Sequence, residues 1–149
     1  MKFKDFLVYY NIKNKETRKE LKKAFKVISN PCNIIIMLKL NELGLTPITA
    51  VVSELEQVVD CSNTWTRQVI GRMITFVMQQ FGYKSDGKRH RIKESVHKST
   101  YFKTGTLYIK DKNITPKYKV KAKVEKVNIK KENNNEVQTL HTKTEIETN

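Results

Sequence analysis

Residues 46–59 and 62–81 carry apolar side chains at helical spacing, and a junction of only about four residues separates the two stretches. In the first stretch the apolar positions are Ile48, Val51, Val52, Leu55 and Val58. In the second they are Trp65, Val69, Ile70, Met73, Ile74, Val77 and Phe81. Thr46-Pro47 and Ser62 are typical helix starts, and Gly82 is a typical stop. The pattern predicts two consecutive helices joined by a tight turn.

Two further helices are predicted upstream. Residues 16–28 place apolar groups on one side and lysines and arginines on the other, as in an amphipathic helix. Pro31 suits the first turn of a second, buried helix, which Gly44 ends. Residues 3–10 form an aromatic-rich arm, which we expect to pack on the core or on a second subunit because a small domain rarely leaves such a cluster exposed.

The chain is strongly basic, with 29 Lys+Arg against 15 Asp+Glu and a formal net charge of +14. Such an excess points first to a polyanionic partner such as nucleic acid. Eight basic and two acidic residues fall in 82–110, whereas 45–81 carries two basic and three acidic ones. The positive charge therefore flanks a nearly neutral middle.

After Gly82 the sequence becomes basic and then β-favouring, at residues 99–102 and 106–109, which predicts a hairpin or two strands. The last 39 residues, 111–149, hold few apolar groups and should form a mostly disordered, Lys-rich tail. One exception is the strand-like alternation of Tyr118, Val120, Ala122 and Val124.

Three helices, a short turn before the last and a basic β segment follow the element order of a winged helix-turn-helix. The stretch Ala24–Leu38, with Ser29-Asn30-Pro31 at its centre, resembles the opening of ArsR-type and related archaeal and bacterial winged-helix regulators. Residues 61–73 resemble the recognition helix of the same superfamily, and Trp65 is larger than the residue common at its position. Asn33 replaces a usual Arg, and residues 51–54 lack the Cys-Val-Cys metal sensor, so metal sensing is not implied.

If Ile70 and Met73 face the core, a polar face lies opposite them on the helix. Its members are Asn63, Thr64, Arg67, Gln68 and Gly71, with Arg72 at the edge. Arg pairs with guanine and Gln or Asn with adenine in the major groove, and a glycine permits close approach of the backbone. The alternative is an ordinary solvated helix face.

The basic run after Gly82 is expected to form a wing over the DNA backbone, and the alternative is a solvated basic loop. Its predicted contact residues are Lys88, Arg89, Arg91 and Lys93, within a run that also includes Lys84 and Lys98.

Other chemistry finds little support in the sequence. His90, Glu94 and His97 lie close together but make a weak metal site, and no nucleotide-binding, hydrolase or paired CxxC motif occurs. We therefore expect no enzyme activity, no cofactor and no metal. Cys32 and Cys61 are expected to be buried free thiols, although a disulfide remains an alternative.

The longest apolar run, residues 34–38, is far shorter than the ~20 residues that a membrane span needs, and no signal peptide is visible. The sequence thus predicts a cytoplasmic protein with no membrane partner.

The predicted architecture is α+β, a mostly helical winged helix-turn-helix with a C-terminal β-hairpin wing. It comprises an N-terminal arm (1–14), the winged domain (15–110) and the flexible tail (111–149). The predicted function is sequence-specific binding of double-stranded DNA by a homodimer that regulates transcription, with helix 62–81 in the major groove. Two alternatives are a winged-helix accessory protein of a plasmid or viral nucleoprotein assembly, and an RNA-binding protein that stacks bases on Tyr101, Phe102 and Tyr108.

Overall fold

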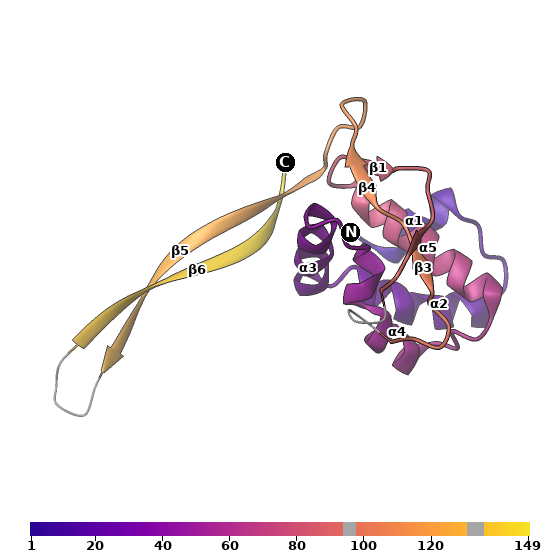
Figure 1. Cartoon of the computed structure of the whole chain (residues 1–149), viewed down its shortest axis with the longest axis horizontal. Helices are drawn as coiled ribbons and strands as arrows, with labels where there is room; N and C mark the ends of the chain where they lie inside the picture. The colour runs from indigo at the N-terminus through magenta and orange to yellow at the C-terminus, as the bar shows by residue number, and fades with distance from the viewer. Residues whose placement is uncertain (94–97, 131–135) are drawn as a thin grey trace.

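A computed structural model describes the backbone of residues 1–93, 98–130 and 136–149, and the side chains of the same ranges outside 123–143. Its described part is α+β, with a helical body, short antiparallel strand pairs and a long hairpin (Figure 1). The helices are α1 (Phe3–Tyr9), α2 (Lys15–Ile28), α3 (Pro31–Glu42), the 3-10 helix η1 (Pro47–Ala50), α4 (Val52–Val58) and α5 (Thr64–Gln79). The strands are β1 (Tyr83–Ser85), β2 (His90–Arg91), β3 (Thr104–Gly105), β4 (Tyr108–Lys110), β5 (Tyr118–Lys130) and β6 (Glu136–Thr148).

Asparagine caps the three long helices, because its side-chain oxygen accepts the otherwise unpaired amide hydrogens of the first turn. Asn14 accepts from the Glu16 amide at 2.9 Å, and Asn30 accepts from the Cys32 amide at the same distance. The start of α5 differs from the sequence prediction by one residue. Asn63 is its cap rather than Ser62, whose hydroxyl bonds the Asp60 carboxylate instead.

The single helix predicted over residues 46–59 is divided into η1 and α4. The break lies at Val51, whose φ of −120° and ψ of −5° leave the helical region. Pro47 starts a tight 3-10 turn, and the β-branched residues that follow favour the α-helix only weakly. The break still leaves Val51 and Val52 fully buried.

The N-terminal arm folds as α1 and packs on the body of its own chain. Phe6 is 1% exposed, and its ring centroid lies 6.0 Å from that of Phe25 in α2 and 5.8 Å from that of Phe76 in α5. Aromatic pairs at such distances stabilise a core beyond their burial. The expectation that the arm packs on the core is therefore confirmed.

Strands β1 to β4 form two short antiparallel pairs. β1 pairs with β4 and β2 with β3, and the Asp86 amide donates to the Leu107 carbonyl at 3.0 Å between the two pairs. We call residues 83–93 and 98–110 the wing. The β structure predicted after Gly82 is confirmed only in part, because β4 pairs with β1 and β3 with β2 rather than with each other. Residues 99–102 are not a strand, and Ser99 is buried there and donates to Glu56 at 2.6 Å.

The expected flexible tail is instead a long hairpin, β5–β6, in antiparallel register from Tyr118 opposite Thr148 to Lys130 opposite Glu136. Low apolar content prevents a chain from forming a core, but a hairpin is held by its backbone ladder and by cross-strand pairs. The ion pair of Lys121 with Glu147, at 3.8 Å, is one such pair. The strand-like alternation noted from Tyr118 onward is thus confirmed.

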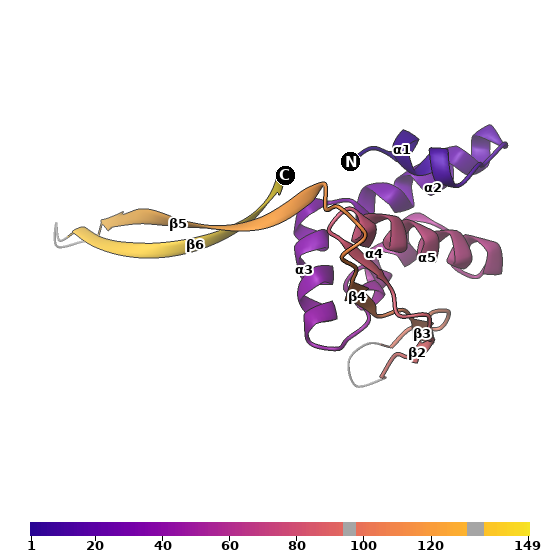
Figure 2. The same cartoon turned by 90° about the horizontal axis from the view of Figure 1, so that it is seen from above.

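The base of this hairpin is fixed to the end of α5. The Gln80 carbonyl accepts from the amides of Lys117 and Tyr118, at 2.8 and 3.1 Å. The Tyr118 ring lies 6.0 Å from that of Phe81. From there the hairpin extends past α3, away from the body (Figures 1 and 2).

Candidate nucleic-acid interface

An open groove of about 630 Å³ lies between the outer face of α5 and the wing. The helix contributes Thr64, Arg67, Gln68 and Gly71, and the wing contributes Lys88, Arg89, Tyr101 and Lys103. Two segments far apart in the sequence, both predicted as DNA contacts, therefore line one surface.

The groove is positively charged. Four cations line it, namely Arg67, Lys88, Arg89 and Lys103, and none of its described lining residues is an aspartate or glutamate. A concave surface lined by one sign of charge attracts the opposite charge over a distance of about one Debye length, ~8–10 Å at physiological salt. The groove is thus suited to a polyanion.

Arg67 has an additional role in the local structure. Its Nη1 donates to the carbonyls of Cys61 and Ser62 at 2.8 and 3.0 Å, and its Nη2 donates to Thr64 Oγ1 at 3.3 Å. The guanidinium thereby closes the turn that precedes α5. Gln68, one residue later, is exposed on the groove.

Gly71 lies one helical turn beyond Arg67 and Gln68, on the groove side of α5. A Cβ added at this glycine would have no heavy atom within 4 Å, so the position is open to an approaching ligand. Gly105 in β3 differs, because its added Cβ would lie 2.8 Å from the Cβ of Thr46. This glycine allows the wing to lie close to η1.

Four of the ten predicted contact residues lie outside the groove lining. Asn63 faces a separate hollow with Glu16, Glu20 and Asp60, and its side-chain oxygen is occupied by the amides of Trp65 and Thr66. Arg91 and Lys93 line a hollow between the wing and residues 43–49. Arg72 is exposed on α5.

Tyr101 and Lys103 also line the groove, although neither was predicted as a DNA contact. Lys103 reaches back to donate to the Ser99 carbonyl at 2.6 Å, and Ser99 is in turn bonded to Glu56 of α4. The charge excess of residues 82–110 was a usable signal for Lys103. Tyr101 was predicted only as a stacking platform for RNA.

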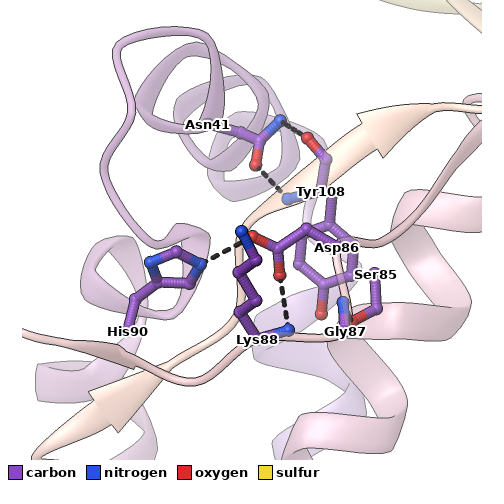
Figure 3. Close-up of polar contacts among 7 residues, drawn as sticks. All are labelled: Asn41, Ser85, Asp86, Gly87, Lys88, His90 and Tyr108. Carbon is purple, nitrogen blue, oxygen red and sulfur yellow. Dashed lines mark hydrogen bonds and ion pairs between the residues drawn. The ribbon is translucent and has the colours of Figure 1, made fainter.

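Asn41 of α3 ties the wing to the helical body (Figure 3). Its amide nitrogen donates to the Tyr108 carbonyl at 2.9 Å, and its oxygen accepts from the Tyr108 amide at 2.8 Å. The Tyr108 hydroxyl shares a further hydrogen bond of 2.9 Å with Thr75 of α5. Burial raises the pKa of this hydroxyl, which keeps it protonated as a hydrogen-bonding group.

A second set of contacts orders the bend of the wing between β1 and β2 (Figure 3). The Asp86 carboxylate accepts from the Lys88 amide at 3.0 Å and lies 2.6 Å from His90 Nε2. These two bonds, the backbone one foremost, hold the pKa of Asp86 below its usual value. The Gly87 amide donates to Ser85 Oγ at 3.0 Å. Asp86 is thus bonded within the wing, and Lys88 and Arg89 line the groove.

The structure also bears on the proposed base-stacking rings, on the possible metal cluster and on the two cysteines. Phe102 and Tyr108 are 5% and 6% exposed, so of the three proposed base-stacking rings only Tyr101 has an accessible face. Glu94 and His97 lie outside the described residues, which contain no group of side chains arranged for a metal ion. Both cysteines are free, and Cys61 is buried as expected. Cys32 is exposed, because it occupies the outer side of the first turn of α3.

No family model matches the chain, and comparisons with curated proteins and with solved structures likewise found no significant match. Among the described residues, no helix is both long enough and apolar enough to cross a bilayer.

Proposed function

We propose that this protein binds double-stranded DNA as a winged helix-turn-helix, with the first half of α5 in the major groove and the wing along the phosphate backbone. The cationic groove that is free of described carboxylates carries the proposal. It joins an exposed polar helix face to the loops of the wing, whose basic side chains line the same surface. A merely solvated helix face would not require basic groups from a second, distant segment.

Dimensions support this mode of binding. An α-helix with its side chains is ~10–12 Å wide and the major groove is ~12 Å wide, so a helix with one exposed face fits. Helices α4 and α5 correspond to the two helices of the helix-turn-helix, and residues 59–63 join them. The Arg67 guanidinium fixes this turn through its bonds to the Cys61 and Ser62 carbonyls. A rigid turn presents α5 in one orientation, which base recognition requires.

The roles of individual residues follow from their exposure and chemistry. Gln68 can form a bidentate pair with adenine, and Thr64 can bond a base edge or a phosphate. Lys88, Arg89 and Lys103 supply phosphate contacts, which position the protein without reading sequence. The protein thus acts by binding, as a transcriptional regulator, with neither catalysis nor a cofactor.

Selection of bound sites from random duplex DNA tests the proposal. We expect enrichment of a defined site, and we expect duplex DNA to compete better than single-stranded RNA of equal length at the same salt concentration. Equal recovery of all duplexes would leave only backbone binding, and preference for the RNA would overturn the proposal. Footprinting at one promoter rather than uniform coating of DNA would distinguish a regulator from an assembly protein.

A further inference from the structure

α3 carries exposed apolar groups on the side turned away from the body. Ile36 is 47% exposed and Leu43, just beyond the end of the helix, is 68% exposed, with half-buried Leu40 between them. These residues fall at helical spacing on one side. We call Ile36, Leu40 and Leu43 the α3 face.

The β5–β6 hairpin leaves the body beside this helix. A hollow of about 550 Å³ separates its base from α3, and Ile35, Leu38, Val120 and Thr144 are among the residues that line it. Ile146 is half-buried against the body, whereas Val120, its register partner, is 42% exposed. Because register partners lie on the same side of a hairpin, Val120 and Ile146 form an apolar pair at its base, beside α3, and Val120 is left largely uncovered.

A hairpin of this length needs more support than its base receives. Strands of 13 residues extend by ~40 Å, and an isolated two-stranded hairpin is at best marginally stable in water. Packing against another surface is the usual source of stability.

We propose that the second surface belongs to another copy of this chain, and that two copies form a closed dimer in which each hairpin lies over the α3 face of the other. The charges beside the α3 face support this choice, because the exposed residues Lys39 and Glu42 of the same helix carry opposite signs. Such a surface can complement itself across a two-fold axis, whereas the single-sign groove of α5 suits a polyanion.

Charge also disfavours pairing of the hairpins edge to edge. β5 carries five lysines and one glutamate, whereas β6 carries three glutamates and one lysine. Joining β5 to β5, or β6 to β6, would place like charges beside each other, which destabilises a sheet. Joining β5 to β6 would be a heterologous contact that does not close at two copies. Packing the side of the hairpin that carries Val120 on the α3 face avoids both problems.

The arrangement deepens the proposed function, on which its biological purpose rests. The hairpin is fixed at the C-terminal end of α5, whereas the groove is formed by the N-terminal half of that helix and the wing. In Figure 2 the hairpin and the wing lie on different sides of the body. A dimer joined through α3 and the hairpin therefore leaves both cationic grooves open for two DNA half-sites.

Sedimentation equilibrium of the full chain without DNA tests the interface separately from the function. We expect a mass of two 17.5 kDa chains. Ile36→Glu, Leu43→Glu and Val120→Glu should each raise the dimer dissociation constant at least tenfold, which corresponds to about 1.4 kcal/mol. Val8→Glu is the matched control, because Val8 on α1 is 81% exposed and should tolerate the charge without effect.

Circular dichroism confirms that each variant is folded, and Leu43 and Val120 are tested separately in case Ile36→Glu disturbs α3. A single-chain mass at all concentrations, a dimer that survives all three substitutions, or growth beyond two copies would overturn the proposal. The monomeric variants should still bind a short duplex in a salt-dependent way. Failure of the wild type to bind that duplex would count against the proposed function and not against the interface.

Discussion

Arg67 and Gln68 are neighbours on α5, but their surroundings give them different roles. The Arg67 guanidinium is held by two carbonyls of the preceding turn, so replacing it disturbs the turn as well as any DNA contact. Gln68 is exposed on the groove and can be replaced without exposing a core group. The two residues therefore differ in what their substitution can reveal.

Gln68→Ala should weaken binding to the preferred DNA site by about 1–3 kcal/mol, because alanine cannot form the bidentate pair with a base, and should leave affinity for random DNA nearly unchanged. Titration of both duplexes by fluorescence anisotropy measures the ratio. Gln79→Ala is the control, since Gln79 is exposed on the same helix but does not line the groove. An unchanged ratio in Gln68→Ala would mean that α5 does not read bases through this residue.

Cys61 gives a prediction about pH. Burial, with smaller contributions from Glu56 and Asp60, raises the pKa of this thiol from 9.0 to about 11. The unfolded chain then loses the thiol proton at lower pH than the folded chain, so the associated stability is present below pH 9 and is lost as pH rises toward 11. In a Cys32→Ser background, the folded protein should react slowly with iodoacetamide at pH 8.

The unfolded protein should react quickly under the same conditions, which provides the control. The free energy of unfolding, measured with urea, should fall less steeply between pH 9 and 11 when Cys61 is also replaced by Ala. Fast alkylation of the folded Cys32→Ser protein at pH 8 would contradict the burial of this thiol.

At the scale of elements, local signals predict the structure where they act within one segment. The spacing of apolar residues predicts α2, α3 and α5 within one or two residues, and the Asn-Pro start marks the beginning of α3. The break at Val51 was missed because periodicity cannot distinguish a 3-10 turn followed by a helix from one continuous helix. The hairpin β5–β6 was largely missed because its strands are held by pairing with each other, which composition does not record.

The wing is the element whose charge should control affinity for all duplexes. Replacing Lys88, Arg89 and Arg91 together by Ala should flatten the plot of log K against log salt by roughly 0.9 for each phosphate that the variant no longer neutralises. Lys88 and Arg89 line the groove, whereas Arg91 lies in the neighbouring hollow, so the first two should account for most of the change.

Lys19, Lys22 and Lys26, three exposed lysines of α2, provide a control with the same reduction in charge. Their replacement should change the slope less, because they lie outside the groove lining. Equal slopes in the two triple variants would show that net charge, rather than the wing, governs binding.

At the scale of the whole molecule, the sequence predicts the residues of the candidate site better than their assembly. Six of the ten predicted residues share one groove, and their residue types were the basis for choosing them. Asn63 is separated from them because it was needed as a cap, and Arg91 and Lys93 because the wing places them beside residues 43–49. The cap at Asn63 is a local interaction that the sequence could have indicated, whereas the placement of Arg91 and Lys93 depends on tertiary packing, which no local pattern encodes.

Removal of residues 112–149 should leave a folded domain. Every residue in the described hydrophobic core lies between Phe6 and Tyr108, so the shortened chain should retain a cooperative melting transition. It should nevertheless be less stable by roughly 1–3 kcal/mol, because Phe81 would no longer be covered by Tyr118 and would become accessible to water. Differential scanning calorimetry measures both properties.

Tyr118→Ala in the full chain separates this contact from the rest of the hairpin. Tyr118 contacts Phe81, and its hydroxyl accepts from the amino group of Met1 at 3.1 Å, so its replacement should reproduce most of the decrease in stability. All proteins in the comparison should carry Leu43→Glu and be measured at several concentrations, so that any contribution of self-association to the melting curves is visible. Absence of the cooperative transition in the shortened chain would mean that the hairpin is part of the folding unit. A small effect of Tyr118→Ala beside a large effect of truncation would instead assign the stability to the packing of the hairpin on α3.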